Sequence, residues 1–171
     1  MARVLIVGCG CRGRALAREL AAAGHAVRGT TRDPERLAEI EAAGVEAVVA
    51  DPDRLGTVMA QLHGVSVVCW LMGSARGEAG ADLHGARLRT MLERLVDTPV
   101  RGVVYEAGGS VEPNLLARGA AAVVEASATW SIPAEVVEAD PGQPRAWTAA
   151  MTAAVECLLL PDRNVSNPER I

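Results

Sequence analysis

Phenylalanine and lysine are both missing from this chain of 171 residues, and aromatic side chains of any kind are scarce. Tyr105 is the single tyrosine, and all 17 basic residues are arginine. The absence of lysine excludes a Schiff-base mechanism and a lysine that acts as general base or proton-relay partner. Half of the residues are apolar, which is typical of a globular chain, so the core must consist mainly of alanine, valine and leucine.

Long apolar runs, a strong net charge and a cysteine framework are also absent. No run approaches the roughly 20 apolar residues that a membrane span needs, and no signal-peptide pattern precedes the first apolar stretch. The formal net charge of −4 gives no electrostatic reason to expect a nucleic acid or an anionic membrane as partner. The four cysteines are irregularly spaced. We therefore expect a reduced, cytoplasmic protein without a metal site, and the sequence leaves a homodimer open.

The most informative segment lies at the start of the chain, where an apolar run ends in closely spaced glycines. Residues 4–7 lead into Gly8, Gly10 and Gly13, which have the G-x-G-x-x-G spacing, and an amphipathic stretch follows from Arg14. Strand, tight turn and helix in this order let the backbone approach a dinucleotide pyrophosphate, and the helix start favours anions. The alternative is a glycine turn used only for close packing. The predicted cofactor contacts in this segment are Gly8, Gly10, Cys11, Arg12 and Gly13.

Strand-like and helix-like stretches alternate along the chain. We expect strands at 3–7, 26–31, 46–50, 65–71, 100–106 and 134–138. We expect helices at 12–23, 33–43, 51–62, 82–97, 113–130 and 145–160, a loop at 73–80 and a polar tail at 161–171. Such alternation implies a parallel sheet covered on both faces. Right-handed crossovers then predict one doubly wound α/β domain over residues 1–160, with six strands in the order 3-2-1-4-5-6.

A ligand of such a sheet binds outside the carboxyl ends of the strands, at the switch point between the first and fourth strands. The segments expected at this edge are 8–13, 30–33, 50–53, 70–76 and 105–111.

Four segments carry a family resemblance: VLIVGCGCRGRALARELAAAGHAVRGTTRDP at the start, VVADPDR after the third strand, RGVVYEAGGSV at the fifth and IPAEVVEADP at the sixth. On these segments, residues 2 to about 140 resemble the extended and atypical branches of the short-chain dehydrogenase/reductase superfamily. The resemblance implies a Rossmann-type fold and a bound NAD(P), with the adenine near Asp51 and Pro52.

The catalytic signature of that superfamily, Tyr-x-x-x-Lys on the helix after the fifth strand, is missing. The corresponding stretch, PNLLARGAAAVVEASATW, contains no tyrosine, and the chain contains no lysine. We also expect no counterpart of the C-terminal substrate region of the extended members. The resemblance therefore implies a cofactor site without the usual reductase chemistry.

The end of the second strand predicts the choice between the two nicotinamide cofactors. Arg32 follows Thr31 there, and a guanidinium suits the 2′-phosphate of NADP, whereas a carboxylate suits the ribose of NAD. Asp33 lies near the acidic position, but the following Pro34 makes it a better helix N-cap. We therefore expect Thr31 and Arg32 to contact the cofactor and NADP(H) to be preferred over NAD(H). The alternative for Arg32 is a solvated surface side chain.

Further contacts are expected from the ends of the third and fourth strands. Arg12 is expected over the pyrophosphate or the 2′-phosphate, with a solvent-facing side chain as the alternative. Cys9 and Cys11 have no histidine beside them, so they are better explained as small loop-filling residues than as a metal or redox site. The remaining predicted cofactor contacts are Asp51, Pro52, Leu71, Met72 and Gly73.

Candidate catalytic residues are few. Tyr105 is a weak candidate, since a phenol can protonate a carbonyl oxygen as hydride arrives, and the alternative is a core tyrosine. His84, expected on a helix near the ligand edge, is weaker still, and His25 and His63 are interpreted as turn residues. Two functions stay open. One is an NADP(H)-dependent oxidoreductase that acts on a small molecule with non-standard catalytic residues. The other is a non-catalytic NADP(H)-binding sensor or regulatory partner.

Overall fold

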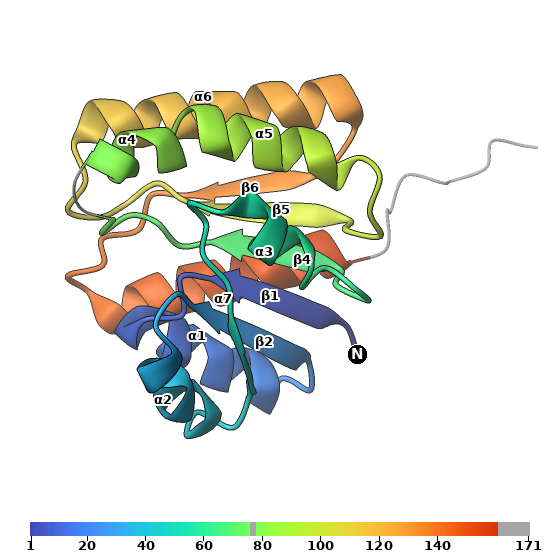
Figure 1. Ribbon diagram of the computed structural model, residues 1–171, viewed down its shortest axis with the longest axis vertical. Coiled ribbons are helices and arrows are strands. Elements are labelled where there is room, and N and C mark those ends of the chain that lie inside the picture. Colours follow the sequence, from blue (N-terminus) through green and yellow to red (C-terminus); the bar gives the residue numbers. More distant parts are fainter. Residues whose placement is uncertain (76–77, 161–171) are drawn as a thin grey trace, which may run out of the picture.

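Residues 1–75 and 78–160 are described by a computed structural model, in which six strands form one sheet (Figure 1). The sheet order is β3-β2-β1-β4-β5-β6, and all neighbouring strands are parallel. This confirms the predicted doubly wound α/β fold. The strands are β1 (Arg3–Val7), β2 (Ala26–Thr31), β3 (Glu46–Val49), β4 (Val67–Trp70), β5 (Gly102–Glu106) and β6 (Ala134–Val137).

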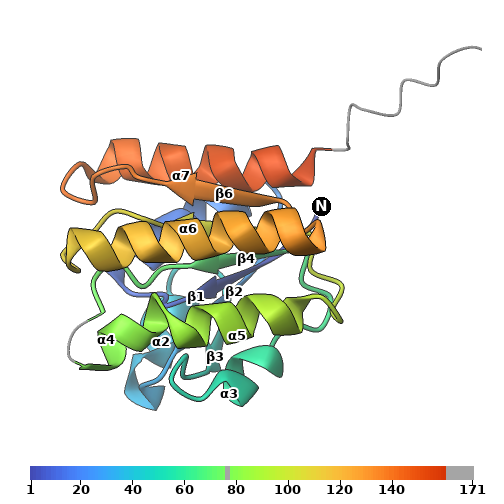
Figure 2. The same ribbon diagram turned by 90° about the horizontal axis from the view of Figure 1, so that it is seen from above.

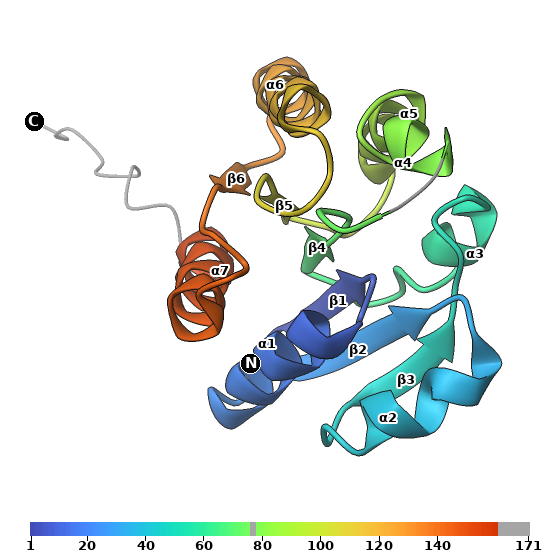
Figure 3. The same cartoon turned by 90° about the vertical axis from the view of Figure 1, so that its left-hand side faces the viewer.

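Helices cover both faces of the sheet (Figures 2 and 3). One face carries α1 (Cys11–Ala22), α2 (Leu37–Glu41) and α7 (Pro144–Leu159). The other face carries α3 (Leu55–Met59), α4 (Glu78–Leu83), α5 (Ala86–Leu95) and α6 (Pro113–Trp130). Among the described residues, no helix has both the length and the apolar character that a membrane span requires.

Two hydrophobic cores form because successive side chains of a strand point to opposite faces. In β1, Leu5 and Val7 pack under the helices α3 to α6, whereas Val4 and Ile6 pack under α1, α2 and α7. All four residues of the central strand β4 are buried, as expected for a parallel strand covered on both sides. The sheet therefore holds the carboxyl ends of β1, β2 and β4 in fixed positions at one edge.

The largest differences from the predicted helices lie at 82–97 and at 51–62. The helix predicted at 82–97 is wrong in its continuity, because His84 and Gly85 form a turn between α4 and α5. The helix predicted to open at Asp51 begins at Leu55, because the Asp51 carboxylate accepts a hydrogen bond from the Asp53 N–H (3.0 Å) and holds a turn there. The loop predicted at 73–80 is shorter than expected, since α4 begins at residue 78. The predicted tail at 161–171 lies outside the described residues.

The predicted N-cap at Asp33 is confirmed. Its side chain accepts a hydrogen bond from the Glu35 N–H (3.0 Å), and Pro34 opens a short 3-10 helix, η1 (Pro34–Arg36), that runs into α2. The carboxylate of Asp33 is thus occupied at the start of this helix rather than directed along the sheet edge.

Candidate functional site

The three glycines of the loop between β1 and α1 have three different environments. Gly8 has a φ of 85°, where side chains are strained, and a Cβ there would lie 2.6 Å from the Leu71 carbonyl oxygen. A Cβ at Gly13 would approach the Gly8 carbonyl oxygen to 3.2 Å, so this glycine lets α1 pack closely on β1. A Cβ at Gly10 would meet nothing within 4 Å. Tight turn, open approach and close packing are the roles that these glycines have in a dinucleotide-binding loop.

Two adjoining cavities lie at the carboxyl edge of the sheet beside this loop. The larger, which we call the β2-side cavity, has a volume of about 270 Å³ and extends from the glycine loop past the ends of β2 and β3. The smaller, the glycine-loop cavity, has a volume of about 230 Å³ and lies over the start of α1. Both are lined by Gly8, Gly10, Leu71 and Ser74, so they adjoin along these residues, and we call the two together the groove. The space above Gly10 is therefore open toward both cavities.

Most of the predicted cofactor contacts line this groove. Asp51 and Gly73 line neither of its two cavities, since Asp51 holds the turn before α3 and the Gly73 N–H donates to Glu106 Oε2 (2.9 Å). The predicted residues that do line it are Gly8, Gly10, Cys11, Arg12, Gly13, Thr31, Arg32, Pro52, Leu71 and Met72. Lining residues that sequence reasoning did not place among the contacts are Cys9, Thr30, Arg36, Ala50, Ser74, Ala75 and Leu83.

Arg12 points toward the ends of β4 and β5. Its Nη2 donates to Ser74 Oγ (2.7 Å) and to Glu106 Oε1 (3.0 Å), and its guanidinium lies 5.6 Å from the centre of the Trp147 ring. This direction takes it away from the cavity that Arg32 lines. Arg12 instead borders the glycine-loop cavity and a third one. That third space, the β5–β6 cavity, measures about 310 Å³ and is lined by Arg12, Gly109, Ser110, Asp140, Pro141 and Gly142.

Glu106 is the buried partner of this arginine. Its side chain has no exposed surface, and burial raises its pKa, while Arg12, the Gly73 N–H and Trp147 act in the opposite direction. A buried carboxylate that lost such partners would leave an uncompensated charge inside the protein. Glu106 thus joins the start of α1, the loop after β4 and the end of β5 around the groove.

Tyr105 and His84 form a second buried pair, on the other face of β5. The Tyr105 hydroxyl lies 2.6 Å from His84 Nδ1, and His84 Nε2 lies 3.0 Å from the Met72 carbonyl oxygen. Since a carbonyl only accepts, Nε2 carries the proton, and Nδ1 of the neutral ring accepts from the tyrosine hydroxyl. The Leu116 carbonyl oxygen, 3.2 Å from the same hydroxyl, is the second acceptor for its single proton. Burial raises the pKa of Tyr105 and lowers that of His84. Tyr105 lines none of the cavities described here, so its surroundings favour a structural role over that of a catalytic acid.

The two cysteines of the loop differ, and only Cys9 fills space inside the protein. Cys9 is buried, and burial raises its pKa to about 11, so it stays a thiol. Its sulfur occupies room that a side chain at Gly29 would need, since a Cβ there would lie 2.7 Å from it. Cys11 is exposed. Among residues 1–75 and 78–160, no group of three histidine, cysteine or acidic side chains is placed to hold a metal ion.

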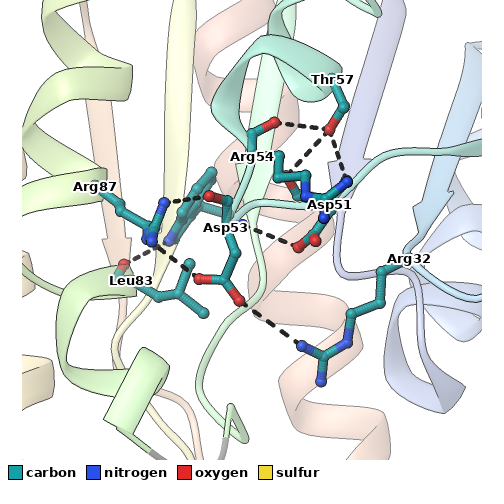
Figure 4. Close-up of polar contacts among 8 residues, drawn as sticks. Arg32, Asp51, Asp53, Arg54, Thr57, Leu83 and Arg87 are labelled. Carbon is teal, nitrogen blue, oxygen red and sulfur yellow. Dashed lines mark hydrogen bonds and ion pairs between the residues drawn. The ribbon is translucent and has the colours of Figure 1, made fainter.

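The outer wall of the β2-side cavity carries a cluster of charges (Figure 4). The Arg32 side chain is 69% exposed, and its Nη1 lies 3.9 Å from Asp53 Oδ2. Asp53 Oδ1 in turn lies 3.2 Å from Arg87 Nε, and Arg87 Nη1 donates to the backbone oxygen of Asp53. Asp53 is thus placed between two guanidinium groups, one from the end of β2 and one from α5.

A family model described as NAD(P)H-binding matches residues 8–105, which hold the glycine loop and strands β2 to β5. Among solved structures, BdcA from E. coli is 18% identical with a TM-score of 0.68 and covers 93% of this chain and 94% of its own. A putative NAD-dependent epimerase/dehydratase from Bacillus halodurans is 21% identical, with a TM-score of 0.65 and coverage of 81% and 70%. No curated protein sequence matches the chain.

A triphenylmethane reductase from Citrobacter sp., solved with NADP(H), is 19% identical with a TM-score of 0.61. The match covers 80% of this chain and 48% of the reductase. The chain likewise spans about half of a UDP-glucuronic acid 4-epimerase structure, at 55%. At these identities the structures share the fold.

Proposed function

Because the chain belongs to the NAD(P)H-binding family, we propose that it binds NADP(H) along the groove and acts as an oxidoreductase on a small molecule. The observation that carries the proposal is the open space above Gly10, at the start of a 12-residue helix and between two joined cavities. The backbone N–H groups and the dipole of this helix end favour a pyrophosphate.

Preference for NADP(H) is supported by the charges of the β2-side cavity. Arg32 and Arg36 both line it, and a guanidinium binds phosphate oxygens through charge-assisted hydrogen bonds. Asp33, the carboxylate that would suit the ribose of NAD, caps η1 instead. Bonds of this kind contribute about 1.5–3 kcal/mol, or roughly one to two decades in affinity.

The nicotinamide end would lie toward Arg12 and Ser74, beyond the glycine loop. Bound cofactor supplies a hydride. The chain supplies polar groups: the Ser74 hydroxyl accepts from Arg12, and its own O–H is left to donate a hydrogen bond to a substrate oxygen, while the proton that completes a reduction comes from solvent. The β5–β6 cavity, which also borders Arg12, offers room for a small substrate next to this position.

A second function is favoured by a separate observation. Tyr105 is buried against His84, and the chain has no lysine, so the Tyr/Lys proton donor of short-chain reductases is missing. A protein that reads NADP(H) without turning it over, as a sensor or regulatory partner, needs only the groove.

The cofactor preference is tested by titrating NADPH and NADH separately into the wild-type protein, Arg32→Ala and Arg118→Ala. Arg118 is an exposed arginine of α6 that lines none of the cavities above, so it controls for the loss of one surface charge. We expect Arg32→Ala to weaken NADPH binding by about 10- to 100-fold with little effect on NADH. Equal wild-type affinities, or a preference that survives in Arg32→Ala, would contradict the proposal.

The choice between enzyme and sensor is tested by the loss of NADPH fluorescence with a panel of aldehydes, ketones and imines. Turnover that stops in Ser74→Ala supports the oxidoreductase. Saturable NADPH binding without turnover of any compound in the panel favours the sensor.

A further inference from the structure

We infer that Asp53 and Arg87 are positioning residues that set how strongly the β2-side cavity prefers a 2′-phosphate, because they control the charge available on Arg32. Neither residue is among those that line the cavities described above, so neither is expected to touch the cofactor. The inference rests on the proposed preference for NADP(H) and adds the residues that tune it.

Asp53 is held in place by its own turn. Its N–H donates to the Asp51 carboxylate at 3.0 Å, and the Thr57 hydroxyl accepts from the Asp51 N–H at 2.8 Å. The turn therefore fixes the backbone of Asp53, and the ion pair with Arg87 holds its side chain, which is only 24% exposed. A fixed and half-buried carboxylate acts on its neighbours more strongly than a mobile surface one does.

The two arginines share this carboxylate unequally. Arg87 approaches Asp53 to 3.2 Å and also bonds its backbone oxygen, whereas Arg32 stays 3.9 Å away and 69% exposed (Figure 4). At 3.9 Å the Arg32 guanidinium lies beyond hydrogen-bond distance of the acid. Arg87 is thus the closer partner of the Asp53 carboxylate, and Arg32 remains free to turn toward a ligand in the cavity.

Loss of Arg87 would weaken NADPH binding in two ways. The uncompensated Asp53 carboxylate would draw Arg32 into a close ion pair, and it would repel a phosphate that carries roughly −1.5 to −2 charges. Loss of the Asp53 carboxylate would have the opposite effect, since Arg32 would then face no competing anion. Because NADH carries no 2′-phosphate, its affinity should stay constant in both cases.

The test measures dissociation constants for NADPH and NADH in wild type, Asp53→Asn, Arg87→Gln and the double variant. Arg89→Gln is the matched control, because Arg89 is an exposed arginine of the same helix α5 and forms none of the ion pairs found among the described residues. Arg87→Gln should weaken NADPH binding by about three- to tenfold and Asp53→Asn should tighten it by a similar factor, as expected for partly exposed charge pairs. The double variant should bind NADPH at least as tightly as wild type, since the acid that Arg87 neutralises is gone.

The NADH values separate this role from a merely structural one. A variant that disrupts the structure of the cavity would weaken the binding of both cofactors together, whereas the inferred role changes only the affinity for NADPH. If wild type prefers NADPH and Arg32→Ala abolishes that preference, while Asp53→Asn and Arg87→Gln leave it within twofold of wild type, the inference is overturned and the proposed function stands. If wild type binds both cofactors equally, the proposed preference fails and the inference fails with it.

Discussion

Substitutions at the three loop glycines should separate effects on folding stability from effects on cofactor binding. The reason is that an added side chain meets a different environment at each glycine. Gly10 has φ −75° and ψ −156°, an extended backbone that any residue adopts, and its Cβ would face open space. Gly10→Val should therefore fold normally and place two methyl groups where the pyrophosphate approaches. Gly8→Ala and Gly13→Ala are the comparison variants, since their added Cβ atoms point into packed protein.

The magnitudes follow from these environments. A left-handed backbone costs a non-glycine residue about 1–2 kcal/mol, and overlap with the Leu71 carbonyl adds to this, so Gly8→Ala should lose at least about 2 kcal/mol of unfolding free energy. Gly13→Ala should lose less, because its closest contact of 3.2 Å needs a shift of only tenths of an ångström. Gly10→Val should cost under about 1 kcal/mol, which in a domain of this size is a Tm change of roughly 2–4 °C at most.

Cofactor affinity should follow the opposite order, with the largest loss in Gly10→Val, the variant that loses least stability. Excluding the pyrophosphate from the helix start removes charge-assisted hydrogen bonds, so Gly10→Val should weaken NADPH binding by about 10- to 100-fold. Thermal melting and NADPH titration of all three variants provide both readings. Wild-type affinity in a folded Gly10→Val protein would refute the placement of the ligand, and wild-type stability of Gly8→Ala would refute the described loop geometry.

Two further predictions concern the buried pair of Tyr105 and His84. Tyr105→Phe should lower the unfolding free energy by about 1–3 kcal/mol, because it leaves Nδ1 of His84 buried without a donor, and an unchanged urea midpoint would argue against the pair. Burial lowers the pKa of His84 in the folded protein, so the unfolded chain binds the extra proton first and stability should fall as the pH drops below the ordinary value of 6.5. Urea midpoints at pH 5 and pH 7.5 should show a smaller difference in His84→Gln than in wild type or in a His63→Gln control, and an equal difference in all three would contradict this.

The strands and their order follow from the sequence because they depend on local pattern and handedness. Short stretches rich in valine and isoleucine, flanked by glycine or proline, mark most of the strands, and right-handed crossovers leave few orders open. The break between α4 and α5 depends on tertiary contacts instead. The apolar stripe at Leu88, Met91 and Leu92 predicts a helix through this region correctly, but His84 bonds Met72 and Tyr105 in the core and lies in a turn. Such partners are distant in the chain, so no local signal shows them.

The candidate site likewise has a part that the sequence shows and a part that it does not. The glycine loop is visible in the sequence because its spacing specifies backbone conformations, and Gly8 and Gly13 have the environments that this spacing demands. The direction of Arg12 is not visible, because its partners Ser74 and Glu106 lie 62 and 94 positions away. Ion pairs between residues that are distant in the chain can be identified only from the folded structure.

The central claim is that the groove beside Gly10 holds a nicotinamide dinucleotide with its 2′-phosphate near Arg32. Calorimetric titration of NADPH into the wild-type protein tests it most directly, with 2′,5′-ADP as competitor, because that fragment carries the 2′-phosphate without the nicotinamide. We expect saturable binding of one NADPH per chain that 2′,5′-ADP displaces. A folded protein that shows no saturable binding of NADPH, or that binds NADPH without competition from 2′,5′-ADP, would contradict it.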